Sequence, residues 1–170
     1  MDNSPHPRPP APPHGSRRLA DPDPFHLTRF VDAQTHLYRI ALAELEAGKK
    51  ESHWMWFIFP QLRGLGFSRM ASFYGISSRD EAQAYLAHPL LGPRLRECTL
   101  TVLSRQDRAL ATILGSPDDM KLCSCMTLFA TVSSDGLLEP SLFRTALEVF
   151  CGGKADPRTL ALLARRENSR

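Results

Sequence analysis

The motifs that define well-known enzyme classes are absent from this chain of 170 residues. It has no G-x-S-x-G element, no P-loop and no H-E-x-x-H pair. A glycine-rich stretch at residues 64–69 begins like G-x-G-x-x-G, but it ends in Arg69 and follows no predicted strand. We interpret it as a turn. The sequence therefore leaves open whether the protein is an enzyme.

Long apolar runs are also missing. The longest runs without a charged residue, 52–62 and 122–134, are shorter than the ~18–20 residues that span a bilayer. No apolar segment near the N-terminus resembles a secretory signal. We therefore expect a cytoplasmic protein of bacterial type that does not interact with a membrane.

Cysteine pairs with metal-ligand spacing are absent as well. The four cysteines are Cys98, Cys123, Cys125 and Cys151, and none forms a C-x-x-C pair. On a helix, Cys123 and Cys125 would point about 200° apart and could not hold one metal ion. We expect four reduced, buried thiols, with no metal site and no cofactor.

Strand signals are scarce, because no alternating run of β-branched residues exceeds four. Helix starts recur instead, as Asp followed by Pro at Asp23 and Pro24 and again at Asp156 and Pro157. Gly48 predicts the end of the first helix. Further predicted starts or caps are a capping box from Ser78 to Glu81, His88, Asp118 and residues 139–141. The pattern predicts an all-α, compact single domain of seven or eight helices.

Proline and charge divide the chain unevenly. Eight of the 14 prolines lie in the first 24 residues, so we expect a disordered Pro-rich arm over residues 1–22 and one domain over residues 23–167. The net charge of +3 comes from the last twenty residues, since residues 25–150 carry thirteen basic and thirteen acidic side chains. A neutral body lacks the basic face that nucleic-acid binding needs. The oligomeric state is not predicted.

The aromatic segment at residues 52–61 is the first candidate site. It holds both tryptophans, Trp54 and Trp56, together with Ser52, His53 and Gln61. Aromatic faces can stack on a planar ligand, and histidine can exchange protons near neutral pH. Because aromatic side chains also dominate protein cores, a buried structural segment is the alternative.

The segment around Lys121 is the second candidate. If Asp118 caps the helix, Lys121 lies in its first turn, where a cation opposes the helix dipole. Its placement requires a salt bridge or an anionic ligand. Ser124 and Thr127 lie a three-residue step apart. Alternatively, both hydroxyls bond to helix carbonyls and Lys121 pairs with a nearby carboxylate.

Several longer stretches carry a resemblance to a known family. They are D-P-F at 23–25, R-F-V-D-A-Q at 29–34, S-H-W-M-W-F-I-F-P-Q-L at 52–62, H-P-L-L-G-P-R-L at 88–95, K-L at 121–122 and M-T-L-F at 126–129. Over roughly residues 23–165 the chain resembles domain-of-unknown-function family 1810. Where the family pattern has a second serine before M-T-L-F, this chain has Cys125.

The resemblance implies a mainly α-helical, usually bacterial and cytosolic domain, and it implies no established activity. Some members carry the label calpastatin. Calpain inhibitors are long, disordered repeat proteins, whereas this body is helical and rich in apolar residues, so we do not adopt the label.

These observations lead to three functional hypotheses. The first is a small planar anionic ligand, nucleotide-like, in an aromatic pocket; its predicted binding residues are Ser52, Trp54, Trp56, Gln61, Lys121, Ser124 and Thr127. The second is a hydrolase that acts on a nucleotide-like substrate with His53 as the acid or base. The third is a protein-interaction module.

Overall fold

The computed structural model describes residues 21–133 and 141–168, and over these residues the all-α prediction is confirmed. The only β contact in the described part of the chain is a single parallel bridge between Leu62 and Ile76. The nine helices described are α1 (Thr28–Ala47), α2 (Met55–Ile58), α3 (Arg69–Tyr74), α4 (Arg79–Ala87), α5 (Leu91–Leu103), α6 (Leu110–Leu114), α7 (Asp118–Val132), α8 (Leu142–Phe150) and α9 (Pro157–Glu167). The short helices α2, α3 and α6 bring the number above the seven or eight predicted.

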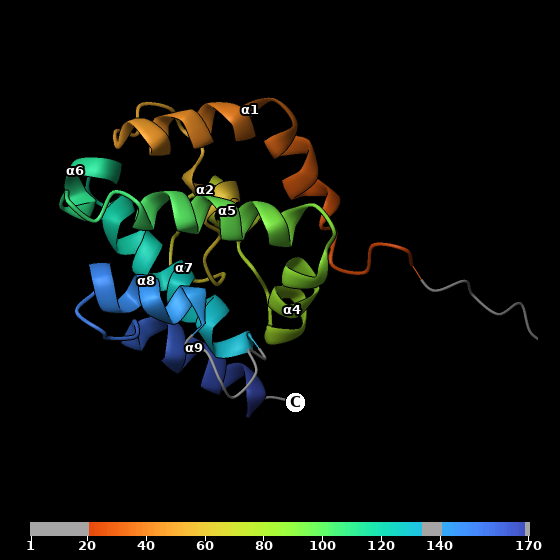
Figure 1. Ribbon diagram of the computed structural model, residues 1–170. Coiled ribbons are helices and arrows are strands. Elements are labelled where there is room, and N and C mark those ends of the chain that lie inside the picture. Colours follow the sequence, from red (N-terminus) through yellow and green to blue (C-terminus); the bar gives the residue numbers. More distant parts are fainter. Residues whose placement is uncertain (1–20, 134–140, 169–170) are drawn as a thin grey trace, which may run out of the picture.

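Helix α7 is the centre of the arrangement. It packs against α8, α4, α6 and α9, while α1 and α4 pack against α5 (Figure 1). Its residues from Cys125 to Phe129 are all buried, as expected for a helix that is covered on every side. The short α2 is wedged between α1, α3 and α5. Of the two segments singled out in the sequence, α2 is largely buried, whereas the start of α7 is partly exposed, with Met120 at 63%.

The first predicted helix start is correct in its chemistry and wrong by four residues in its position. The Asp23 carboxylate accepts hydrogen bonds from the N–H groups of Leu27, at 2.6 Å, and Thr28, at 2.9 Å, but α1 itself begins at Thr28. Gly48 ends α1 with a φ of 69°, as predicted for a left-handed cap. The start predicted at residues 139–141 lies largely outside the described residues, although the Ser141 hydroxyl accepts from the N–H of Arg144.

The predicted capping box at α4 forms only in part. The Ser78 hydroxyl accepts from the N–H of Glu81, as predicted. The Glu81 carboxylate does not return the bond to Ser78, because it pairs with buried Arg29 at 2.5 Å and accepts from Ser77. His88 does cap α5, since its Nδ1 accepts from the N–H groups at the helix start. The Glu81 carboxylate therefore makes a long-range ion pair in place of the local hydrogen bond of a full capping box.

The prediction of four reduced cysteines is wrong for two of them. Cys123 of α7 and Cys151, which follows α8, form a disulfide with a Cα–Cα distance of 6.0 Å. Cys98 and Cys125 are free and fully buried, as predicted. Burial raises the pKa of the Cys98 thiol to about 12. The sequence spacing could not indicate this bridge, because the pairing depends on how α8 packs on α7.

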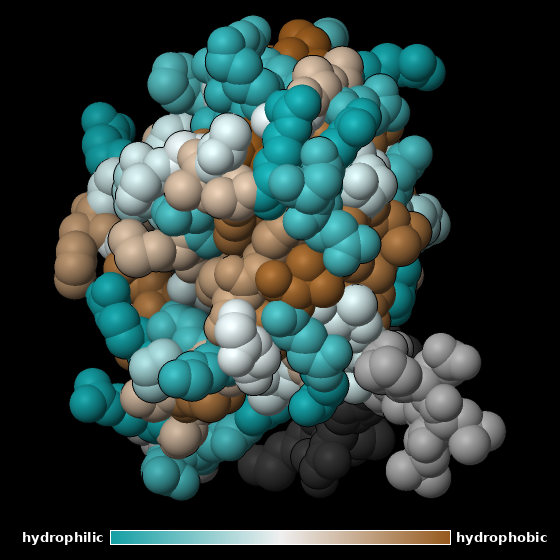
Figure 2. Space-filling view, turned by 60° about the vertical axis from the view of Figure 1, so that its left-hand side comes forward, coloured by the Kyte–Doolittle hydropathy of each residue, from teal (hydrophilic) through white to brown (hydrophobic). Residues whose placement is uncertain are grey.

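Most of the predicted Pro-rich arm, residues 1–20, lies outside the described part of the chain, so its disorder stays a prediction. Among the described helices, none has both the length and the apolar character needed to cross a bilayer. No group of three or more potential metal-ligating side chains occurs in the same described residues. On the face seen in Figure 2, apolar surface gathers near the centre and hydrophilic side chains border it.

Candidate functional site

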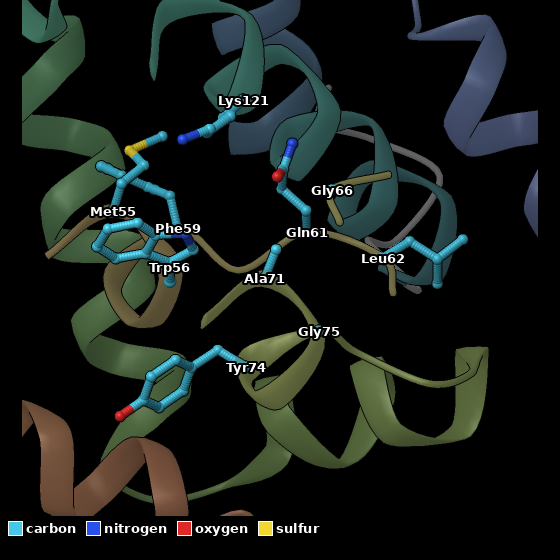
Figure 3. A pocket seen from close by; sticks show the side chains of 10 residues that line it. All are labelled: Met55, Trp56, Phe59, Gln61, Leu62, Gly66, Ala71, Tyr74, Gly75 and Lys121. Atoms are coloured by element: carbon cyan, nitrogen blue, oxygen red, sulfur yellow. The ribbon is translucent and has the colours of Figure 1, made fainter. Parts of the chain in front are cut away.

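The two candidate segments meet in the structure. The Nζ atom of Lys121, from α7, lies 5.5 Å from the ring centroid of Trp56, from α2. An ammonium group over an indole face is attracted by the negative face of the ring. Figure 3 shows Lys121 reaching across above Trp56, while the side chain of Gln61 rises from the segment after α2 towards α7.

Two hollows adjoin at this point. A narrow slot of about 10 Å³ has room for about one water molecule, and an open groove of about 490 Å³ lies beside it. Gln61, Gly66 and Lys121 line both hollows. The slot is completed by Met55, Trp56, Phe59, Leu62, Ala71, Tyr74 and Gly75. The groove is completed by Leu65, Pro117, Met120, Cys123, Ser124, Cys151, Lys154, Ala155, Asp156, Pro157 and Arg158.

The charge of Lys121 is only partly compensated. Its Nζ donates to Asp118 at 2.8 Å, and Lys50 also pairs with Asp118, at 3.0 Å. Burial alone would raise the pKa of Asp118, but its bonds with Lys121 and Lys50 outweigh burial and lower it. Two cations thus share one carboxylate, and this group of three keeps one net positive charge beside the groove.

Asp118 does not act as the predicted N-cap. It is the first residue of α7, Pro117 precedes it, and no side-chain cap bond is made at this helix end. Its carboxylate is held by the two lysines instead. The structural alternative stated for this segment is therefore present: Lys121 pairs with Asp118, and the hydroxyls of Ser124 and Thr127 donate to helix carbonyls at 3.3 and 2.8 Å. The salt bridge uses one of the three donors of the ammonium group.

Gln61 is the second polar side chain at the junction. Its backbone carbonyl accepts from Ile76, but its side-chain amide makes no hydrogen bond within the described residues. Gly66 lies next to it, where an added Cβ would come within 2.8 Å of the Cβ of Ala71. The glycine therefore lets the segment after α2 run close against α3 and close one side of the slot.

Ser124 and Thr127 position the opposite wall of the groove. The Ser124 hydroxyl donates to the Asp156 carboxylate at 2.9 Å, and the Asp156 N–H donates to Thr127 Oγ1 at 2.8 Å. Asp156 in turn caps α9, as its Asp-Pro pattern predicted. Burial acts to raise the pKa of Asp156, but hydrogen bonds from Thr159, Ser124 and the start of α9 lower it. Ser124 also lines the groove, whereas Thr127 is almost fully buried.

Trp54 lies behind the site, within the core. Its side chain is fully buried, and its Nε1–H donates to Glu44 at 2.8 Å. The same carboxylate accepts from the N–H of Glu51 and from both the N–H and the hydroxyl of Ser52. The expectation that Trp54 and Ser52 face a ligand is therefore not met in this conformation, because α1 holds both through Glu44.

His53, which lies between Ser52 and Trp54 in the sequence, is exposed. It makes no hydrogen bond or ion pair within the described part of the chain, and it is absent from the lining of both hollows. A general acid or base needs a partner that orients the ring and a substrate within hydrogen-bond reach. The structure brings Trp56, Gln61, Lys121 and Ser124 together and leaves His53 apart from them.

Several groove residues were not singled out from the sequence. Lys154 and Arg158 flank Asp156 along the groove, and Cys123 and Cys151 form part of its wall. The helix start at Asp156 could have indicated them, because basic residues lie on both sides of it. Nothing local in the sequence could have paired Glu44 with Ser52 and Trp54.

Comparison with known proteins agrees with this fold. Residues 24–163 match the family model described as "Protein of unknown function (DUF1810)". A similar solved structure is that of the conserved hypothetical protein Rv1873 from Mycobacterium tuberculosis, at 56% identity and a TM-score of 0.79; the match covers 84% of this chain and 99% of that one. No curated protein matches the chain. Since the family model spans most of the sequence, the chain belongs to the DUF1810 family.

Proposed function

We propose that the protein binds a small, planar, anionic molecule, nucleotide-like in its chemistry, in the groove beside Lys121. The observation that carries the proposal is the convergence of Lys121 and Gln61 at the junction of the two hollows. The ammonium has donors left after its bond to Asp118, and the amide has no partner among the described residues. An anionic group at this junction would accept from both.

The rest of the groove suits the rest of such a ligand. Lys154 and Arg158 add positive charge, and Leu65 and Met120 offer apolar surface; Met120 is 63% exposed. The slot, with room for about one water, is too small for a ring. The planar part is therefore expected to lie in the groove, and Trp56 acts by holding Lys121 rather than by stacking on the ligand.

Thermal-shift and calorimetric titrations with adenosine monophosphate, inorganic phosphate and adenosine test the proposal. Ligand that binds the native state raises its stability. We expect adenosine monophosphate to stabilise the protein most and Lys121→Gln to weaken its binding about tenfold or more. Lys49→Gln is the matched control, because Lys49 is exposed and pairs with Glu51 outside the groove. No stabilisation at millimolar ligand, or equal binding by both variants, would refute the proposal.

The two alternatives have different support. The hydrolase alternative would use His53 as acid or base, and no contact of His53 among the described residues supports it. The interaction module is favoured by the apolar side chains around α3, a helix without a buried residue: Phe67 is 91% exposed, Phe73 50% and Met70 39%. Apolar patches of this kind mark interaction surfaces in other proteins. Concentration-dependent sedimentation that Phe67→Ser abolishes would favour this alternative.

A further inference from the structure

The four cysteines fall into two chemically different pairs. Cys98 and Cys125 are fully buried, and burial raises the pKa of both thiols. Cys123 and Cys151 are only half-buried, are joined as a disulfide, and both line the open groove. Reactive cysteines are found in partly exposed, electropositive surroundings, whereas buried ones are inert. Only the second pair meets the first condition, that of access.

The groove also meets the second condition, that of charge. Lys121, Lys154 and Arg158 line it, against one acidic residue, Asp156. The Asp156 carboxylate accepts bonds from Ser124, from the Thr159 hydroxyl and from N–H groups at the start of α9. The Asp156 carboxylate is therefore already hydrogen-bonded at the start of α9. A positive groove attracts an anion and stabilises a thiolate that forms within it.

Two residues without side chains follow Cys151. Gly152 and Gly153 follow it with φ values of 62° and 71°. A Cβ added at either glycine would meet no atom within 4 Å. No side chain at these two positions therefore stands between Cys151 and Lys154, and both of these residues line the groove.

From this geometry we infer that the Cys123–Cys151 disulfide is redox-active and that the groove takes a small anionic thiol, with which the disulfide exchanges. The inference rests on the proposed function, because it assigns a substrate class to the same groove. The nucleotide-like ligand is then one anion that the groove accommodates, and the anionic thiol is the one that reacts there.

The reaction proceeds in two balanced steps. The thiolate of the small molecule attacks Sγ of Cys123 or Cys151, a new S–S bond forms, and the other cysteine leaves as a thiolate that takes up a proton. A second thiolate attacks the small molecule's sulfur in this mixed disulfide and releases the remaining cysteine, which is also protonated. The protein disulfide gains two electrons and two protons, and the two thiols are oxidised to their disulfide.

Reduction rates of the oxidised, full-length protein test the inference. Mercaptoethanesulfonate is the anionic thiol and cysteamine the cationic one, and each rate is divided by that thiol's rate with a small neutral disulfide. We expect the normalised ratio to favour the anionic thiol by about tenfold at low salt and to approach one at high salt. Lys154→Gln should lower the ratio about threefold, whereas Lys49→Gln should leave it unchanged.

Thiol counting by mass spectrometry gives a second readout. We expect two thiols to react after reduction of the native protein, Cys123 and Cys151, and the buried Cys98 and Cys125 to react only after unfolding. Four free thiols in the oxidised protein, or equal normalised rates at low salt, would overturn the inference.

The proposed function is tested separately with adenosine monophosphate and the Cys123→Ser/Cys151→Ser variant, which cannot exchange. If the variant still binds the nucleotide and the wild-type protein shows no preference for the anionic thiol, the redox inference alone is overturned. If neither the wild type nor the variant binds adenosine monophosphate, the proposed function is overturned.

Discussion

The two tryptophans lie two residues apart in one segment, yet they occupy opposite environments. Trp54 is fully buried, with Lys50 over its ring at 5.1 Å and its Nε1–H on Glu44. Trp56 is half-buried, with Lys121 over its ring at 5.5 Å. Both lysines pair with the same carboxylate, that of Asp118. A lysine–tryptophan pair thus occurs twice: Lys50 with Trp54 in the interior, the closed side, and Lys121 with Trp56 at the edge of the groove, the open side.

The difference lies in what the surroundings leave unused. On the closed side, Lys50 also donates to the carbonyl of Ser52 at 2.7 Å, and its side chain is only 9% exposed. On the open side, the Lys121 side chain is 28% exposed. Satisfied donors stabilise the fold, whereas donors that face a hollow are available to a ligand. We therefore assign stability to the first pair and binding to the second.

The largest expected effect is on the closed side. Trp54→Ala should lower the free energy of unfolding by about 3–5 kcal/mol, since it removes a large buried side chain and a donor to Glu44. Trp56→Ala should lower it by only about 1–2 kcal/mol, because its ring is half-buried. Urea unfolding followed by circular dichroism measures both. Equal losses would contradict the division between the two tryptophans.

Acid should act on the closed side through Glu44. Burial would raise the pKa of Glu44, but hydrogen bonds from Ser52, Glu51 and Trp54 hold it at about 2, below its ordinary 4.5. A lowered carboxyl pKa stabilises the fold above pH 4.5, and this stabilisation is lost as the pH falls from 4.5 towards 2. Glu44→Gln should be less stable at pH 7 by about 2 kcal/mol and should show a flatter acid dependence. Parallel acid curves for the two proteins would argue against this role.

A smaller effect is expected on the wall of the groove. Ser124→Ala removes one donor to Asp156, which keeps its bonds at the start of α9, so the loss should be about 0.5–1.5 kcal/mol. Because the pKa of Asp156 is lowered by such bonds, that loss should be seen at neutral pH and shrink in acid. Thermal unfolding at pH 7 and pH 3 measures the difference, and a larger loss at pH 3 would contradict it.

The smallest effect is expected at His53. Its side chain is exposed and has no partner among the described residues, so His53→Ala should change stability by less than about 0.5 kcal/mol. Binding of adenosine monophosphate should also stay unchanged. A clear loss of binding would indicate that His53 contacts the ligand and would favour the hydrolase alternative.

The sequence predicted the features that depend on local chemistry. Gly48 ends a helix, Asp156 and Pro157 begin one, and His88 caps one, because each depends on neighbours within a few residues. For Lys121 in the first turn of α7 the sequence left a salt bridge or an anionic ligand open, and the structure shows the salt bridge.

The features set by long-range packing could not be predicted. Glu81 is drawn to Arg29, 52 positions away, and Cys123 meets Cys151 only because α8 packs on α7. Trp54 and Trp56 belong to one aromatic segment, and contacts with α1 and α7, distant in sequence, distinguish the enclosed ring from the half-buried one. The sequence therefore singled out two segments that meet in the structure, but it did not show which of their residues line the two hollows.

The most direct test of the division between the two sides is the affinity for adenosine monophosphate, measured by calorimetry on folded Lys121→Gln, Trp56→Ala and Lys49→Gln. We predict binding to the wild type and to Lys49→Gln with equal affinity, and about tenfold weaker binding to the other two variants. Equal affinity of all four proteins, or no binding to any of them, would contradict the assignment of the open side to a ligand.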